Sequence, residues 1–227
     1  MTKFFEWTRL ESAFGQVTAC LTVTVQIVFW ATVMGCVLGI LMSQILIRRV
    51  PLLQNIVRIF ISFIRDTPLL VQMMLCYYGF PAFLTIIGID ANRWDRLIFA
   101  FLAYGLNQAG FLAEMFRSAT EAIPVEQTEA AISVGMTKFQ TFRRIIFPQM
   151  VRIVLPAFGN DFVGLFQGTS LVYMLGVMDV MGRARAVGTS SGHFLEPYLV
   201  ALLIYIVISI VLTFLFWIWN RKIVERR

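Results

Sequence analysis

Charged residues are scarce in this chain. Asp, Glu, Lys and Arg together make up 14% of its 227 residues, whereas they make up about 25% of typical soluble proteins. Hydrophobic residues account for 59% of the chain, and its mean hydropathy is +0.78. These values lie far outside the range of soluble domains. The sequence therefore predicts an integral membrane protein.

The residues that build catalytic and metal centres are also scarce. The single histidine, His193, excludes the HExxH zinc motif and most other histidine-based sites. No glycine is followed by lysine, which excludes the phosphate-binding loop of ATPases. Cys20, Cys36 and Cys76 all fall in apolar stretches, where core packing is expected rather than disulfides or metal binding. We therefore expect no catalytic residue, metal or cofactor in this chain.

Long uncharged runs are what the sequence has instead. There are 36 uncharged residues between Glu11 and Arg48 and 24 between Glu196 and Arg221, and about 20 apolar residues suffice to cross a bilayer. A third uncharged stretch, 97–113, has 17 residues, and two further apolar stretches contain two or three charged residues each. The prediction is one all-α membrane domain, 1–227, with five transmembrane helices at approximately 17–47, 55–80, 96–116, 149–173 and 197–219.

The distribution of Lys and Arg predicts the orientation. With the N-terminus outside, 12 of these residues fall on the inner side and 6 on the outer side, and Arg65 is left within the membrane. Positive residues are retained on the cytoplasmic side, so the expected topology is N-out and C-in. The net charge of +6 is then explained by basic helix ends near anionic headgroups, without nucleic acid as a partner.

A polar stretch at approximately 118–147 separates the third and fourth spans. Pro124 suits the first turn of a helix, and Gly135 suits a left-handed terminator. Thr137 and Gln140 form a plausible capping box for a second helix, which Pro148 is expected to end. Two short cytoplasmic helices are therefore predicted.

Each of these helices should have an apolar face. Ala130, Ala131 and Val134 are expected to share one face of the first helix, and Phe139, Phe142 and Ile146 form a stripe on the second. Basic side chains flank that stripe. From these properties alone, the pair could anchor to the membrane surface or contact a partner protein.

Polar residues at membrane depth are costly, so each is a candidate for function. On two spans they fall at helical spacing, in stripes that also include an apolar residue: Ser62, Arg65, Leu69 and Gln72; and Tyr104, Asn107, Phe111 and Glu114. The fourth span carries Asn160, Asp161 and Gln167, followed by Thr169 and Ser170. One interpretation is a path for a zwitterion, in which Arg65 receives a carboxylate and Asp161 an ammonium group. The other pairs Arg65 with Asp66 or Glu114 as a structural contact between helices.

The fourth span is expected to be irregular around Asp161. Pro156 cannot donate a backbone hydrogen bond, and Gly164 and Gly168 follow, as in the broken helices that often bind substrate. In the first span, Gly35 and Gly39 form a GxxxG pattern, which fits a helix contact and chance equally well.

The polar stretch resembles the EAA loop of the membrane subunits of ABC importers. Glu129-Ala130-Ala131 is followed at matching spacing by Gly135, Ile145 and Phe147-Pro148, with Phe147 where the family usually has Leu. Other segments resemble the polar amino acid branch of that family, namely "RDTPLLVQ" (65–72), "LNQAGFLAE" (106–114), "GMTKFQTFRRIIFPQ" (135–149) and "LPAFGNDF" (155–162). Relatives commonly have Lys-Asp where this chain has Gln167-Gly168.

The resemblance implies a permease of the type I importer fold in the cytoplasmic (inner) membrane of a prokaryote. Its expected partners are an ATP-binding subunit, which alone binds ATP and Mg²⁺, a second permease that is identical or related, an extracytoplasmic solute-binding protein and a polar amino acid substrate. The chain itself would be non-catalytic. The resemblance implies ATPase coupling through Glu129, Ala130, Ala131, Gly135, Phe139 and Arg143.

Two other functions fit a polytopic membrane protein. An ion-coupled secondary transporter could use Asp161 and Glu114, although five spans lack the paired halves typical of such folds. The second alternative function is a channel or a membrane-anchored scaffold. Transport that persists without ATP but collapses with an ion gradient would favour the secondary transporter.

Overall fold

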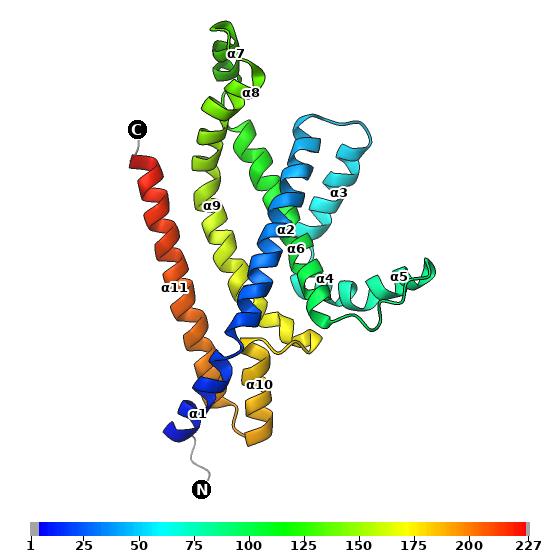
Figure 1. The fold of residues 1–227 in the computed structure, drawn as a ribbon, viewed down its shortest axis with the longest axis vertical. Coiled ribbons are helices and arrows are strands. Elements are labelled where there is room, and N and C mark those ends of the chain that lie inside the picture. The colour runs from blue at the N-terminus through cyan, green and yellow to red at the C-terminus, as the bar shows by residue number, and fades with distance from the viewer. Residues whose placement is uncertain (1–4, 226–227) are drawn as a thin grey trace.

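The structure, a computed structural model, describes residues 5–225, and every regular element within that range is a helix. Figure 1 shows the helices arranged as an elongated bundle. In chain order the elements are α1 (Trp7–Thr18), α2 (Leu21–Ile47), α3 (Leu53–Asp66), α4 (Leu69–Met74), the π-helix η1 (Leu75–Gly79), α5 (Phe80–Ile86), α6 (Arg96–Glu121), α7 (Val125–Ser133), α8 (Lys138–Thr141), the π-helix η2 (Phe142–Ile146), α9 (Phe147–Gly168), the 3₁₀-helix η3 (Thr169–Leu175), α10 (Val180–Ser191) and α11 (Leu195–Glu225).

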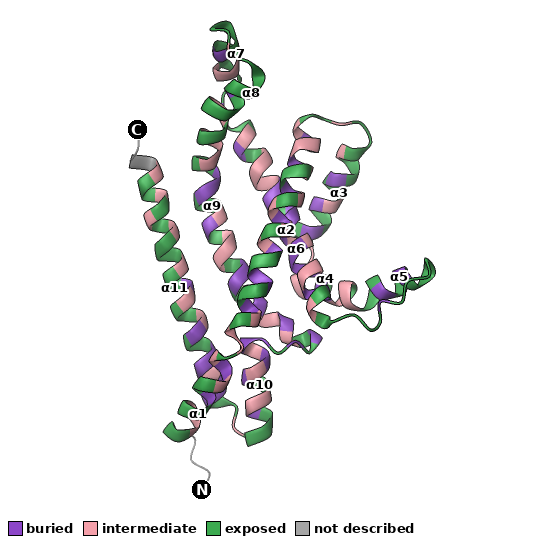
Figure 2. Ribbon diagram, in the orientation of Figure 1, coloured by how far each residue is buried: buried purple, intermediate pink, exposed green. Residues whose placement is uncertain are grey.

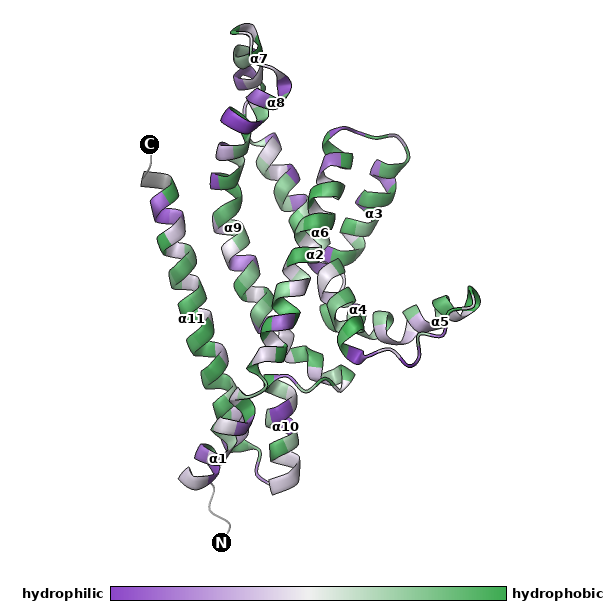
Figure 3. Ribbon diagram, viewed as in Figure 1, coloured by the Kyte–Doolittle hydropathy of each residue, from purple (hydrophilic) through white to green (hydrophobic). Residues whose placement is uncertain are grey.

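The described residues contain four helical runs that are long and apolar enough to cross a membrane: Trp7–Ile47, Leu69–Ile86, Arg96–Glu121 and Leu195–Ile223. A fifth candidate joins Lys138–Leu175 to Val180–Ser191 across a bend of 47°. Many large apolar residues of α11 and α2 are exposed, as expected of surfaces that face lipid. The ribbon of α11 is coloured mostly hydrophobic in Figure 3. The chain is thus an all-α, multi-pass membrane protein with four or five spans.

The centre of the bundle is formed by α2 and α6, which lie side by side (Figure 2). Two glycines of α2 permit this close approach. A Cβ added at Gly35 would lie 2.5 Å from Gln108 Cβ, and one at Gly39 would lie 3.0 Å from Leu112 Cβ. The GxxxG pattern therefore marks a helix contact rather than chance.

The predicted second span is broken. α3 ends at Asp66, and Thr67 is extended, with φ −116° and ψ 145°, before α4 begins at Leu69. Pro68 causes this break, because a proline disfavours the helical conformation of the residue before it. α4, η1 and α5 then run away from the bundle (Figure 1). The expected continuous stripe from Ser62 to Gln72 is consequently interrupted.

Pro148 does not end a helix, contrary to expectation. α8, η2 and α9 follow one another without a gap from Lys138 to Gly168, and Pro148 occupies the first turn of α9. The π-helical segment η2 precedes it, with the Phe147 N–H bonded to the Phe142 carbonyl. Because π-helical turns are wider than α-helical ones, this segment can accommodate a residue that cannot donate the usual bond.

Pro156 also lies inside the α-helix of α9, so the expected irregularity does not begin there. It begins at Thr169, where the chain tightens into η3, and it ends at Gly176, which has φ +78°. The segment α7–α8 lies at the same end of the molecule as the C-terminus, and α1 and α10 lie at the opposite end (Figure 1).

Candidate coupling tip and polar path

The segment between α6 and α9 forms a projecting tip, which we define as residues 124–143 (Figure 1). Pro124 is extended and precedes α7, which begins at Val125, so the proline lies just before the first turn rather than within it. α7 ends where Gly135 adopts φ +84°. The Gly135 N–H bonds to the Ile132 carbonyl at 2.9 Å, and the Met136 N–H bonds to the Ala131 carbonyl at 3.1 Å. The predicted left-handed glycine terminator is confirmed.

The predicted capping box at the start of α8 is also confirmed. The Thr137 N–H donates to Gln140 Oε1 at 2.9 Å, and the Gln140 N–H donates to Thr137 Oγ1 at 3.3 Å. The Thr141 hydroxyl donates to the Thr137 carbonyl at 3.0 Å, and Thr141 itself is buried. The turn between α7 and α8 is therefore fixed by its own hydrogen bonds.

The small residues of α7 do not share one face, contrary to expectation. Ala131 is buried, whereas Ala130 and Val134 are exposed. Adjacent helical residues point about 100° apart, so a helix that packs along one narrow line buries only one of Ala130 and Ala131. Val134 lies past the end of α7, as its C-cap.

Apolar side chains are exposed on the tip. Val134 has 78% of its surface exposed and Phe139 has 70%, with Phe142 exposed as well. The charged residues Glu129 and Arg143 of the same segment are also exposed. Apolar patches surrounded by polar groups commonly mark protein contacts. The tip has the surface of a docking element.

Asp161 lies on α9 and faces α6. Its carboxylate lies close to the side chain of Gln108, and its Oδ2 is buried without a hydrogen-bond partner. Burying a carboxylate oxygen without a partner is costly, so a donor from outside the chain would stabilise it. The neighbouring Asn160 is exposed. Of the predicted path residues, Asp161 has the clearest capacity to bind a ligand.

Gln72 has a structural role that the sequence did not reveal. Its Nε2 lies 2.8 Å from the Ile64 carbonyl and 3.0 Å from the Thr67 carbonyl, and its Oε1 accepts from Asn107 Nδ2 at 2.9 Å. This buried amide therefore satisfies the carbonyls released by the break at Pro68. It joins α3, α4 and α6 instead of facing an open path.

The predicted residues beyond Asp161 are also engaged within the chain. The Gln167 amide donates to Ser209 Oγ on α11 at 3.1 Å. Thr169 is fully buried, and its hydroxyl donates to the Phe166 carbonyl at 2.6 Å. Ser170 is half-buried. The bonds of Gln167 and Thr169 help to hold α9 and η3 in place.

Arg65 and Glu114 line a charged cleft of about 1210 Å³. Four arginines and four acidic residues surround it, namely Arg49, Arg58, Arg65, Arg117, Asp66, Glu114, Glu121 and Glu126. The cleft draws these residues from the turn after α2, from α3, from α6 and from the start of α7.

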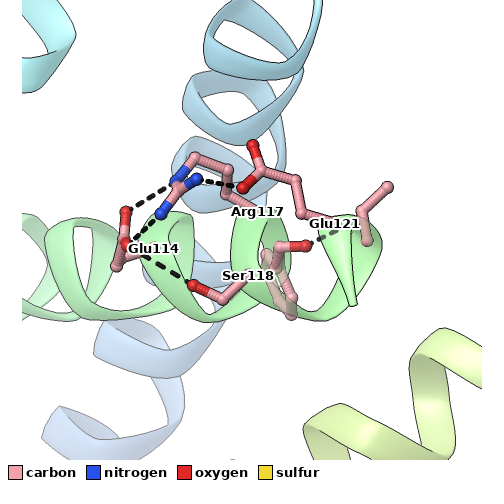
Figure 4. A network of polar contacts seen from close by, with 6 residues as sticks. Glu114, Arg117, Ser118 and Glu121 are labelled. Atoms are coloured by element: carbon pink, nitrogen blue, oxygen red, sulfur yellow. Dashed lines mark hydrogen bonds and ion pairs between the residues drawn. The ribbon is translucent and has the colours of Figure 1, made fainter. Parts of the chain in front are cut away.

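The ion pairs in this cleft differ from those expected. Arg117 lies between Glu114 and Glu121 and pairs with both, and its Nε donates to Glu114 Oε2 at 2.9 Å (Figure 4). Asp66 accepts a hydrogen bond from Ser62 at 2.7 Å. Sequence reasoning missed Arg117, although its spacing of three and four residues from the two glutamates is the helical ion-pair signal.

Comparison with known proteins places this geometry in a family. Residues 35–225 match the family described as "Binding-protein-dependent transport system inner membrane component". The chain is 34% identical to the L-cystine transport system permease protein TcyL of Bacillus subtilis, over 98% of this chain and 93% of that protein. It is 38% identical to the probable amino-acid ABC transporter permease protein PatM of Vibrio harveyi, over 84% and 83% of the two chains.

Solved structures show the same arrangement. "Crystal structure of an amino acid ABC transporter with histidines" contains a chain that matches with a TM-score of 0.85 and 26% identity, over 98% of this chain and 100% of that one. A chain of the MetNI methionine transporter matches with a TM-score of 0.68 at 18% identity, over 96% and 99% of the two chains, and shows the fold alone. The protein belongs to the binding-protein-dependent family of inner membrane transport components, the permease subunits of ABC importers.

Proposed function

We propose that this chain forms the membrane path of an importer for a polar amino acid. The relatives that it resembles include permeases named for amino acid or cystine transport. As a permease subunit it is non-catalytic, and a partner ATPase supplies the hydrolysis. A binding protein would deliver the amino acid outside the cytoplasmic membrane of a prokaryote, and a second permease, identical or related, would complete the path.

The tip carries the coupling in this proposal. Phe139 and Val134 supply an apolar contact for the ATPase, with Glu129, Ala130 and Arg143 around it. Gly135 supports the turn that presents these side chains, and the buried Ala131 anchors α7. The single observation that best supports the proposal is this exposed apolar tip on a turn fixed by its own hydrogen bonds.

The proposed orientation places the tip in the cytoplasm. The C-terminus lies at the same end as the tip and the N-terminus at the other, in keeping with N-out, C-in topology (Figure 1). Asp161 would bind the substrate ammonium group, with Asn160 beside it. Arg65 and Glu114, in the charged cleft, would then lie on the cytoplasmic side of that position. Gln72, Gln167, Thr169 and Ser170 would support the path rather than contact the substrate.

Reconstitution tests the proposal. Vesicles would contain this chain, its ATPase and its binding protein, and each standard amino acid and L-cystine would be added separately. We expect one or a few of these to stimulate ATP hydrolysis and to accumulate inside. Uptake that continues without ATP and stops when the ion gradient is collapsed would overturn the proposal in favour of a secondary transporter.

A further inference from the structure

The tip is connected directly to α9 by two glutamine side chains. Gln149 Nε2 donates to Gln127 Oε1 at 2.5 Å and to the Ile145 carbonyl at 2.9 Å. Both hydrogens of the Gln149 amide are therefore engaged, one by α7 and one by η2. Both glutamines are only partly exposed. This bond joins the first turn of α7 to the first turn of α9.

Apart from this bond, α7 has few anchors. Ala131 is the buried residue within the helix, and Ile123 is buried just before it. Most of its other side chains, including Val125 and Ile132, are exposed. A nine-residue helix with so little buried surface can roll or tilt on its own base unless a specific contact holds it.

The helix that receives the bond is continuous with the candidate binding position. α8, η2 and α9 run without a gap from Lys138 through Gln149 to Asp161. At 1.5 Å per residue, the distance along the helix from Lys138 to Asp161 is roughly 35 Å. Displacement of this continuous helix at its tip end would therefore also displace Asp161.

We infer that Gln149 and Gln127 are positioning residues that make α7 and α9 move as one unit, so that ATPase motion at the tip reaches Asp161. The inference rests on the proposed function and adds the side chains through which coupling passes. Neither glutamine contacts substrate. Their hydrogen bond prevents α7 from shifting without α9.

The test measures amino acid transported per ATP hydrolysed in reconstituted vesicles. The probe is the amino acid that stimulates wild-type hydrolysis most strongly. Gln127→Leu and Gln149→Leu remove the hydrogen bond while keeping similar side-chain volume. We expect the ATPase to copurify normally and to retain its basal hydrolysis, while transport per ATP falls about three- to ten-fold, equivalent to roughly 0.7 to 1.4 kcal/mol of coupling.

Three further variants separate positioning from simple destabilisation. Gln127→Glu keeps an acceptor for Gln149 and should retain near-wild-type transport per ATP. The double variant Gln127→Leu, Gln149→Leu should be no worse than Gln149→Leu alone, because the bond between α7 and α9 is already lost in that single variant. Gln26→Leu, at an exposed position on α2, is the matched control and should leave the ratio unchanged.

Each outcome decides one question. If the wild type is stimulated but both leucine variants keep the wild-type ratio, or if their losses add in the double variant, the coupling role of the two glutamines is wrong and the proposed function stands. If no amino acid stimulates the wild-type complex, the proposed function fails and this inference fails with it.

Discussion

The Tyr104 hydroxyl donates a hydrogen bond to the Gly168 carbonyl at 2.7 Å. Tyr104 is fully buried on α6, and Gly168 is the last residue of α9. The bond thus joins the central helix to the point where α9 changes into η3. It fixes the position of the chain just before the bend towards α10.

Removing this hydroxyl should destabilise the protein without altering its shape. For Tyr104→Phe we expect a loss of about 1 kcal/mol, because the bond is lost and little volume changes. The measurement is the thermal unfolding midpoint in detergent, compared with wild type. Tyr78→Phe, at an exposed ring, is the matched control and should leave the midpoint unchanged. An equal midpoint for Tyr104→Phe would contradict a stabilising bond.

Gly35 should tolerate no side chain. Glycine in a helix interior is usually less stable than alanine by about 0.5–1 kcal/mol, but a Cβ at Gly35 would lie 2.5 Å from Gln108 Cβ. Gly35→Ala is therefore expected to lower the unfolding midpoint. Gly164→Ala in α9, where nothing lies within 4 Å of the added Cβ, should preserve or raise it. Equal changes of the unfolding midpoint in Gly35→Ala and Gly164→Ala would contradict the close packing of α2 against α6 at Gly35.

Gly135 should be needed for coupling rather than for insertion. An alanine in the left-handed conformation costs roughly 1–2 kcal/mol, and Gly135 has open space around it, so the strain is conformational. Gly135→Ala should reduce, and Gly135→Arg should abolish, substrate-stimulated hydrolysis while the protein remains in the membrane. Gly15→Ala, in α1 with open space and no positive φ, serves as the control. If substrate still stimulates ATP hydrolysis by the Gly135→Arg complex to the wild-type level, the tip is not needed for coupling.

Asp161 should be required for transport through its charge. Asp161→Asn keeps nearly the same side-chain size and shape but loses the negative charge. We expect uptake to fall at least about ten-fold, which corresponds to about 1.4 kcal/mol of lost interaction with an ammonium group. Uptake is measured beside the unfolding midpoint, which should stay close to wild type. Full uptake by this variant would assign Asp161 to structure alone.

The sequence predicted the features that depend on local chemistry. The conformation of Gly135 and the capping box at Thr137 are set by residues within a few positions, and both are as expected. The effects of the prolines were predicted less well. Pro68 breaks a predicted span, whereas Pro148 and Pro156 do not end α-helical structure. Neighbouring turns and packing decide which outcome a proline has, and composition does not reveal them.

The candidate site was also predicted only in part. Spacing placed polar residues on common stripes, but it could not show which partners satisfy them. Gln72 turns inward to the end of α3, and Arg117 rather than Arg65 pairs with Glu114. Such choices depend on where a helix breaks and on which side chains meet across the bundle. A sequence identifies candidates for polar contacts, and the tertiary arrangement selects among them.

The arm formed by α4, η1 and α5 extends sideways from the long upright helices (Figure 1). Ile86 and Phe83 near its end are exposed, by 82% and 60%. A nanodisc fitted to the upright helices alone would press its scaffold belt against this arm. Nanodiscs of larger diameter should therefore yield more homogeneous particles than discs whose diameter is chosen from the number of transmembrane helices.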